Sequence, residues 1–201
     1  MSEWLKNTLT LSDACRIAKP LRFNMMFKPV GSLCNLNCAY CYYLDKAEIY
    51  GEEHKMPLDI LEKCIKEYLE INDAEEITFD WHGGEPLLLG LEYFEIIAEL
   101  QNKYKGRKKI LNTIQTNATL INSDFASFFR ENDFLVGVSI DGPQYIHDKY
   151  RKDKGAFPTF DKVLRGIELL HRYGVEFNTL TTINKASEGK GLEVYDFMKK
   201  I

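Results

Sequence analysis

The feature that most constrains the fold is an alternation of strand-like and helix-like runs that repeats five times along the chain. The strand-like runs are 23–30, 76–81, 110–116, 134–140 and 176–183. Each is followed by apolar residues at helical spacing, and these helices are expected from Met56, over 91–104, after Asn122, after Thr159 and over 191–201. Strands that alternate with helices form right-handed βαβ units, so the sequence predicts an α/β fold with a parallel sheet.

Two architectures fit this pattern: the strands can close part of a barrel, or they can form an open doubly wound sheet. The run 134–140 is nearly all apolar in its first half, which is typical of a strand buried on both faces. No linker or low-complexity tract interrupts the chain of 201 residues, so one domain is expected over 22–201, behind an N-terminal arm at 1–21. The third predicted helix carries an aromatic stripe that is expected to pack in the core of this domain: Phe125, Phe128 and Phe129.

Polar or glycine-rich stretches follow every predicted strand. In parallel α/β folds the carboxyl ends of the strands meet at one edge, where sites form. We therefore expect the functional site at that edge. The stretches are 34–41, 81–86, 115–117, 139–143 and 181–184.

The first of these stretches holds three cysteines, Cys34, Cys38 and Cys41, in the spacing C-x3-C-x2-C. Three thiolates on one loop can bind three irons of a cubane cluster and leave the fourth iron open to a small molecule. Two alternatives remain. One is a zinc site completed by His82 or His54, and the other is a redox pair of Cys38 and Cys41, which leaves Cys34 unexplained.

The cysteine count and the net charge narrow the class of protein. The five cysteines are odd in number and three are clustered, which favours metal or cluster ligation in a reducing compartment over a secreted disulfide scaffold. Cys15 and Cys64 are expected to pack in the interior. A net charge of −4 offers no electrostatic case for a nucleic acid or a membrane surface. With no apolar leader and no long apolar run, a cytoplasmic location is expected.

The second stretch contains Gly83-Gly84-Glu85-Pro86. Glycines let a ligand approach the backbone closely, and a carboxylate beside them suits a cationic amine. A plain β–α turn is the alternative.

Several other polar residues have a functional and a structural interpretation. His82 precedes the glycines and is expected to be structural, although it could face the site. His54, His147 and His171 are expected on loops or helix surfaces. Asp141 begins an Asp-Gly-Pro turn that needs no functional role.

The cysteine loop, with Tyr40 just before its last cysteine, resembles the signature of the radical SAM superfamily. The Gly83-Gly84-Glu85-Pro86 stretch resembles that family's second motif. The resemblance implies a partial (β/α) barrel in which Cys34, Cys38 and Cys41 bind a [4Fe–4S] cluster. In that family S-adenosylmethionine (SAM) binds the open iron and is cleaved reductively to methionine and a 5′-deoxyadenosyl radical, which takes a hydrogen atom from the substrate.

The same resemblance implies the SAM-binding residues. The glycine-rich turn would bind the methionyl ammonium, whereas Ser139 and Arg151 would bind the methionyl carboxylate, a group that arginine suits well. Thr116 and Asn117 would meet the ribose or the substrate. A solvated charged loop, 148–154, is the alternative for Arg151. The residues implied are Tyr40, Gly83, Gly84, Glu85, Thr116, Asn117, Ser139 and Arg151.

Four stretches look like the anaerobic sulfatase-maturating enzymes within that superfamily: 28–44, 81–87, 114–117 and 137–143. Such enzymes oxidise a cysteine or serine of a sulfatase to formylglycine. Their general-base aspartate and auxiliary clusters lie in a C-terminal SPASM extension. No cysteine follows Cys64, so the chain is expected to hold the core without the last strand and the extension, and no catalytic residue is assigned within it.

The resemblance also implies partners: a sulfatase or another peptide as substrate, and a reducing protein such as a flavodoxin or ferredoxin. Three alternatives to the sulfatase-maturating function remain. They are another SPASM-type peptide-modifying radical SAM enzyme, a catalytically silent fragment that binds SAM or peptide, and a zinc-stabilised interaction domain.

Overall fold

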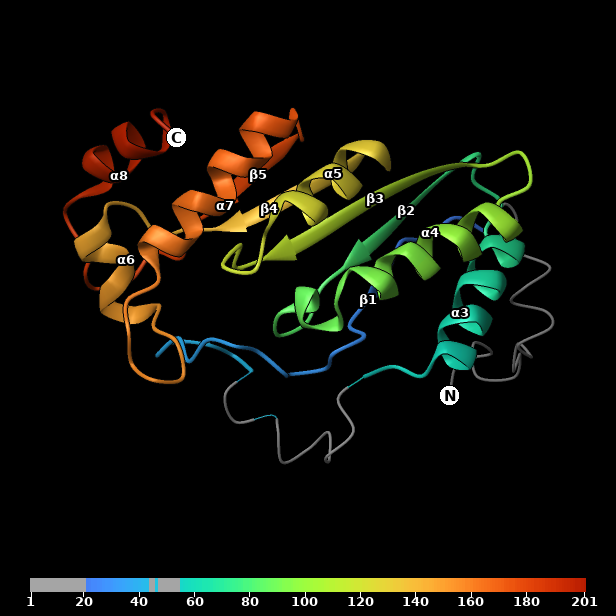
Figure 1. The fold of residues 1–201 in the computed structure, drawn as a ribbon, viewed down its shortest axis with the longest axis horizontal. Coiled ribbons are helices and arrows are strands. Elements are labelled where there is room, and N and C mark those ends of the chain that lie inside the picture. Colours follow the sequence, from blue (N-terminus) through green and yellow to red (C-terminus); the bar gives the residue numbers. More distant parts are fainter. Residues whose placement is uncertain (1–20, 44–45, 47–54) are drawn as a thin grey trace, which may run out of the picture.

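A computed structural model describes residues 21–43, 46 and 55–201, and Cys15, His54 and most of the predicted arm lie outside these ranges. Five parallel strands lie side by side in the order in which they occur in the chain (Figure 1). They are β1 (Met25–Phe27), β2 (Glu76–Trp81), β3 (Lys109–Thr116), β4 (Phe134–Ser139) and β5 (Phe177–Leu180).

Helices connect the strands and cover one face of the sheet (Figure 1). The elements are α3 (Leu58–Ile71), the short 3₁₀ helix η3 (Pro86–Leu89), α4 (Leu91–Tyr104), α5 (Ser123–Glu131), α6 (Gln144–Tyr150), α7 (Phe160–Tyr173) and α8 (Gly191–Met198). No helix within the described ranges has the length and apolar character to cross a membrane.

The strand order decides between the two architectures that the sequence left open. In a doubly wound sheet the strand order reverses at a switch point and helices cover both faces. Here the order runs from β1 to β5 without reversal, and every neighbouring pair is parallel. The fold is therefore an open, incomplete barrel of βα units, as expected.

Burial along β4 corrects one prediction. Val136 and Val138 are fully buried under the helices, but Leu135 is 37% exposed and Ser139 is half-buried. The strand is thus not buried on both faces. The reason is that helices cover only one side of the sheet, so alternate side chains face the open interior of the barrel.

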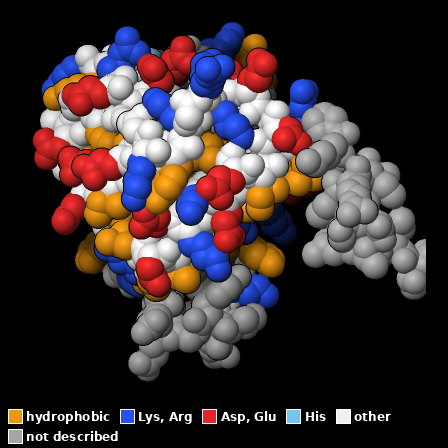
Figure 2. All heavy atoms as spheres, turned by 90° about the vertical axis from the view of Figure 1, so that its right-hand side faces the viewer, with side chains coloured by type: hydrophobic (Ala, Val, Ile, Leu, Met, Phe, Trp, Pro, Cys, Tyr) orange, Lys and Arg blue, Asp and Glu red, His pale blue; other side chains and the backbone are white. Residues whose placement is uncertain are grey.

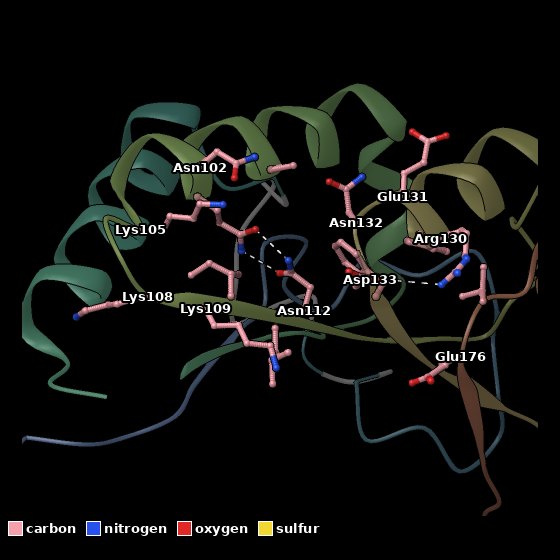
Figure 3. Close-up of a pocket in the computed structure, with 17 residues that line it drawn as sticks. Asn102, Lys105, Lys108, Lys109, Asn112, Arg130, Glu131, Asn132, Asp133 and Glu176 are labelled. Atoms are coloured by element: carbon pink, nitrogen blue, oxygen red, sulfur yellow. Dashed lines mark hydrogen bonds and ion pairs between the residues drawn. The ribbon is translucent and has the colours of Figure 1, made fainter. Parts of the chain in front are cut away.

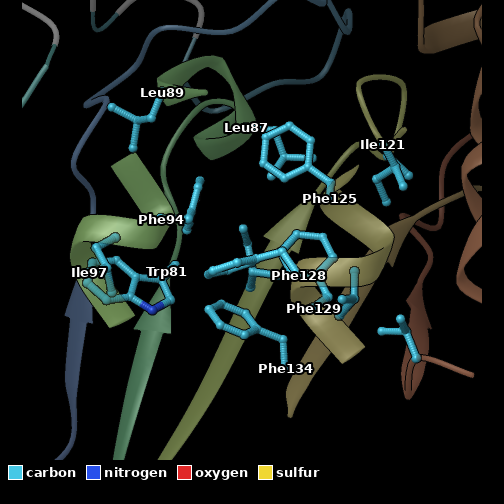
Figure 4. Close-up of a cluster of buried hydrophobic side chains, with 14 of the residues drawn as sticks. Trp81, Leu87, Leu89, Phe94, Ile97, Ile121, Phe125, Phe128, Phe129 and Phe134 are labelled. Atoms are coloured by element: carbon cyan, nitrogen blue, oxygen red, sulfur yellow. The ribbon is translucent and has the colours of Figure 1, made fainter. Parts of the chain in front are cut away.

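Aromatic side chains form the centre of the core between α4, α5 and the sheet (Figure 4). Phe94, Phe129 and Phe134 are almost completely buried. The rings of Phe94 and Phe134 pack edge to face, with their centroids 6.5 Å apart. Phe125 and Phe128 complete this cluster, which confirms the predicted core role of the aromatic stripe. Edge-to-face pairs add about 1 kcal/mol each to the burial of the rings, and this packing holds the helices against the strands.

A cavity of about 630 Å³ opens at the amino ends of β3 and β4 (Figure 3). On one side of it Gln101 and Asn112 exchange two amide hydrogen bonds of 2.8 and 3.0 Å. Asn112 also accepts the Trp81 indole hydrogen at 2.9 Å, so this buried pair satisfies core polar groups.

The charges around this cavity are of both signs. Arg130 pairs with Asp133 at 3.9 Å, and Lys109 pairs with Glu76 at 2.8 Å. Figure 2 views the molecule from the right-hand side of Figure 1, and acidic and basic side chains are interspersed on that face. Pairs of this kind on an exposed surface give no preference for a ligand of either sign.

Candidate functional site

A second cavity, of about 450 Å³, lies at the carboxyl ends of the strands. It collects side chains from the ends of β2, β3, β4 and β5 and from the loop after β1, as the sequence predicted. Its predicted lining residues are Cys34, Cys38, Cys41, Tyr40, Gly83, Gly84, Thr116, Asn117, Ser139 and Arg151. Leu36, Tyr42, Tyr43, His82, Gln115, Leu180, Thr181 and Thr182 complete the lining.

The cysteine loop pairs with the segment that follows α6. The Asn37 backbone N–H donates to the Lys152 carbonyl at 2.7 Å, and the Ala39 N–H donates to the Tyr150 carbonyl at 3.0 Å. These bonds form a short ladder between segments more than a hundred residues apart. They place the cysteines beside Arg151, which lies between the two carbonyls in the chain.

The glycine-rich turn holds the loop from the other side. The Gly84 N–H donates to the Gly31 carbonyl at 2.9 Å. A Cβ on Gly84 would lie 2.1 Å from the Leu33 carbonyl oxygen, and Gly83 has a φ of +129°. Both positions therefore require glycine, the first for space and the second for its backbone conformation.

Nitrogen donors surround two of the sulfurs. Leu36 N–H reaches Cys34 Sγ at 3.4 Å, Asn117 Nδ2 reaches the same sulfur at 3.7 Å, and Tyr43 N–H reaches Cys41 Sγ at 3.4 Å. All three cysteines of the loop are free rather than disulfide-bonded. Donors aimed at sulfur stabilise thiolate ligands of a cluster.

The pKa values of the thiols weaken the redox-pair alternative. Burial raises the pKa of Cys34 to about 11, although the Leu36 N–H opposes the shift. Burial also raises the pKa of Cys38, against the opposing charge of Arg151. A reactive redox cysteine needs a lowered pKa, so the raised pKa of Cys38 gives the Cys38–Cys41 redox pair no support.

The zinc alternative gains no support either. Across the described residues, which omit His54, no three His, Cys, Asp or Glu side chains are grouped around a point where a single ion could sit. His82 lines the cavity, but its Nδ1 accepts the Gly83 N–H at 2.7 Å. Burial, helped by the charge of Lys28, lowers the pKa of His82.

Glu85 is fully buried behind the glycine-rich turn, and its side chain is not part of the cavity lining. Oε1 accepts hydrogen bonds from Thr116 Oγ1 at 2.7 Å and Leu87 N–H at 3.0 Å, and Oε2 accepts one from Asn117 N–H at 2.7 Å. Burial raises the pKa of Glu85 to about 7, although these three bonds oppose the shift. The Glu85 carboxylate thus joins the glycine-rich turn after β2 to the end of β3 by hydrogen bonds.

Asn117 and Thr116 also have structural partners. Asn117 Nδ2 donates to Asn35 Oδ1 at 2.8 Å, and Asn35 Nδ2 donates to Thr119 Oγ1 at 2.9 Å. The end of β3 is therefore bonded to the cysteine loop as well as to the glycine-rich turn. Both residues still line the cavity, where the sequence placed them.

Asp141 is the main site residue that was not assigned from sequence. It is completely buried, forms an ion pair with Arg151, and accepts hydrogen bonds from the Tyr40 hydroxyl and from Thr182 N–H. Burial raises the pKa of Tyr40, and the bond to Asp141 raises it further. Tyr40 therefore stays a neutral donor and connects the cysteine loop to the end of β4.

His147 corrects another expectation. It lies on α6 and is completely buried, not on a surface. Its Nδ1 accepts the Asp141 N–H at 3.4 Å, and its Nε2 lies 3.1 Å from Thr159 Oγ1, which itself donates to the Arg151 carbonyl. His147 is thus hydrogen-bonded to Asp141 directly and is linked to Arg151 through Thr159.

Three other residues singled out from the sequence are not in the cavity lining. Cys64 is partly buried on α3 against the core, as predicted. His171 is exposed on α7, also as predicted. Thr159 directly precedes α7, as expected, but its side chain does not cap the helix. Asp148 Oδ1 accepts the N–H groups of Thr159 and Phe160 at 3.0 Å.

The donor set suits an iron–sulfur cluster with an organic ligand beside it. Three free cysteine sulfurs on one loop line a cavity that is large enough to hold more than an ion. None of the described lining residues is acidic, and Ser139, Arg151 and the amides supply hydrogen-bond donors on the other walls.

Comparison with known proteins agrees with this geometry. A family model for the radical SAM superfamily matches residues 29–198. A serine-type anaerobic sulfatase-maturating enzyme of Bacteroides thetaiotaomicron is 48% identical over 186 residues, which are 92% of this chain and 44% of that enzyme. A cysteine-type anaerobic sulfatase-maturating enzyme of Clostridium novyi is 41% identical over 184 residues, which are 88% of this chain and 48% of that enzyme.

A solved structure shows the same fold. The structure of native anSMEcpe with bound AdoMet and Cp18Cys peptide matches with a TM-score of 0.82 at 40% identity, and the match covers 90% of this chain and 48% of that chain. The chain thus spans about half the length of the curated relatives it matches.

Proposed function

This chain belongs to the radical SAM superfamily, and from that premise we propose that its cavity holds a [4Fe–4S] cluster and S-adenosylmethionine. The observation that carries the proposal is the meeting of three free cysteines, the glycine-rich turn and the Ser139–Arg151 wall around one cavity at the carboxyl ends of the strands. The proposed core is 22–201, with 1–21 as an arm.

In this proposal Cys34, Cys38 and Cys41 would bind three irons of the cluster and leave the fourth without a ligand from this loop. Ser139 and Arg151 bind the methionyl carboxylate. Gly83 and Gly84, where no side chain blocks the backbone, would hold the methionyl ammonium, with the buried carboxyl group of Glu85 behind the turn. Tyr40, Thr116 and Asn117 contact the nucleoside.

A cluster of this type supplies the electron that cleaves SAM to methionine and a 5′-deoxyadenosyl radical. The chain's own residues bind and orient the reactants. The ladder at Asn37 and Ala39 fixes the cysteine loop, and the Asp141–Arg151 pair fixes the guanidinium beside it. Holding the reactants in place is the protein's main contribution to such chemistry.

The substrate is proposed from the relatives. We propose that the full enzyme oxidises a cysteine or serine of a sulfatase to formylglycine, because both types of sulfatase-maturating enzyme match this chain. A flavodoxin or ferredoxin would reduce the cluster. The reducing cytoplasm suits free thiols and an oxygen-sensitive cluster.

Anaerobic reconstitution with iron and sulfide tests the cofactor proposal. The wild-type chain should bind about four irons and absorb at about 400 nm, and with dithionite and SAM it should release 5′-deoxyadenosine. Cys34→Ala, Cys38→Ala and Cys41→Ala should each lose the cluster. Cys64→Ala is the matched control, because Cys64 packs on α3 away from the cavity. Stoichiometric zinc binding without cluster formation would overturn the proposal.

The substrate requires a separate experiment. Sulfatase peptides that differ only in a cysteine or serine at the modified position should be incubated with the full-length protein, and aldehyde formation followed by mass spectrometry. Oxidation of either peptide supports sulfatase maturation. Release of 5′-deoxyadenosine with neither peptide oxidised would favour another peptide-modifying reaction.

A further inference from the structure

Gln115 lies across the interior face of β4 beside a glycine that leaves room for it. Gln115 on β3 is paired in register with Gly137 on β4. A Cβ on Gly137 would lie 2.2 Å from Gln115 Oε1, so any larger residue would push the amide away. Gly137 has an ordinary backbone conformation, so the reason for glycine here is space and not φ.

The amide of Gln115 reaches Ser139, two residues further along β4 on the same face. Gln115 Nε2 donates to Ser139 Oγ at 2.9 Å, and its Oε1 is the atom beside Gly137. An amide nitrogen can only donate, so the serine oxygen is the acceptor in this bond. The single hydroxyl hydrogen of Ser139 therefore remains available.

Ser139 lines a cavity whose described lining has no acidic side chain. Arg151 lines the same cavity, and its Nε is paired with Asp141 Oδ1 at 3.1 Å, which leaves its terminal nitrogens as donors. Two donors that line a cavity with no acidic side chain in its described lining suit an anionic oxygen group such as a carboxylate.

We propose that Gln115 is a positioning residue, because its amide fixes the Ser139 hydroxyl as a donor to the carboxylate of the bound ligand. This role also explains why residue 137 is a glycine, since a larger residue would displace the amide. This inference rests on the proposed function, since the ligand is taken to be SAM. It gives a specific role to Gln115, which the sequence placed only within the polar stretch at the end of the third strand.

The test measures binding rather than turnover. Cluster-loaded protein is titrated anaerobically with SAM and with decarboxylated SAM, which lacks only the carboxylate, by equilibrium dialysis. Gln115→Met keeps the side-chain length but removes the amide donor. It should weaken SAM binding about tenfold or more, as for a lost hydrogen bond to a charged group, and should change binding of the decarboxylated ligand about twofold at most.

A double-mutant cycle with Ser139→Ala shows whether Gln115 acts through Ser139. In the Ser139→Ala background, Gln115→Met should have no further effect on SAM affinity. Gly137→Ala should reproduce the loss by displacing the amide. Asn178→Ala is the matched control, because Asn178 also approaches Gly137 but is not in the cavity lining.

The outcomes separate this inference from the proposed function. If the wild-type protein forms its cluster and binds no SAM, the proposed function fails. Two results would show that only the role of Gln115 is wrong, provided that the wild-type protein binds SAM more tightly than decarboxylated SAM. In the first, Gln115→Met keeps this difference in affinity. In the second, the loss of SAM affinity caused by Gln115→Met adds fully to the loss caused by Ser139→Ala. Should Gln115→Met lose its cluster, Gln115→Asn, whose amide is too short to reach Ser139, gives the same comparison.

Discussion

Asp141 Oδ1 lies 3.1 Å from Arg151 Nε in an ion pair whose side chains are 0% and 10% exposed. Burial disfavours the charged guanidinium, yet the Asp141 carboxylate raises the pKa of Arg151 above its ordinary value. The pair joins the turn after β4 to the segment that holds the cysteine loop. A single buried carboxylate thus orients a proposed ligand-binding residue and, through Tyr40, the loop itself.

Asp141→Asn should destabilise the fold strongly, because it leaves a buried guanidinium without its counter-ion. Removing one partner of such a pair costs about 3–5 kcal/mol, to be measured as the free energy of unfolding in urea. Asp196→Asn removes one side of an exposed pair with Lys199 at 3.6 Å and is the matched control. Its effect should be about 1 kcal/mol or less, and equal effects of the two substitutions would contradict the role given to Asp141.

The sequence predicted the long elements well because each repeats its signal over several turns. The helix expected over 91–104 is α4, which spans Leu91–Tyr104. The short α6 was not predicted, since two turns within a charged stretch carry little periodicity. The strand expected over 23–30 shrinks to Met25–Phe27, because Pro29 cannot donate to a ladder and Gly31 turns with a φ of +56°.

Site residues were predictable where a short motif carries them and were missed where the partners are distant in the chain. The three cysteines sit within eight residues, so their spacing was visible in the sequence. Asp141 and Tyr40 are 101 residues apart, and no local pattern shows that they meet. Glu85 shows a third case: its motif was evident, but only the structure shows that its oxygens bond to Thr116 and Asn117 rather than line the cavity.

Gly84→Ala should prevent the glycine-rich turn from closing on the cysteine loop. The added Cβ would lie 2.1 Å from the Leu33 carbonyl oxygen, a backbone atom that cannot rotate away. We expect a loss of stability of about 3 kcal/mol or more and failure to retain iron after reconstitution, read from urea unfolding and iron analysis.

Gly191→Ala is the control for that substitution. Within the described part of the chain, no atom beyond the neighbouring residues and its own helix lies within 4 Å of a Cβ at Gly191, and the residue is at the start of α8. The change in stability should stay within about 1 kcal/mol, with iron binding unchanged. Full iron binding by Gly84→Ala would show that the turn does not hold the loop as described.

His147 should make stability depend on pH. Burial, helped by the positive charge of Arg151 and opposed by Asp141 and Asp148, lowers the pKa of His147 from 6.5 to about 4. Between these values the unfolded chain binds a proton that the folded chain does not. Stability from this group is therefore complete above pH 6.5 and is lost as the pH falls towards 4, by on the order of 3 kcal/mol in total.

Glu85 acts in the opposite direction over part of this range, because its raised pKa of about 7 favours the folded state at low pH. The effect of His147 must therefore be read as a difference between variants. Urea unfolding at several pH values should show that His147→Gln, which cannot be protonated, loses less stability than the wild type between pH 6.5 and pH 4. His171→Gln, which removes an exposed histidine, should run parallel to the wild type. If His147→Gln also runs parallel, burial and the charge of Arg151 do not hold the His147 ring neutral in the folded protein.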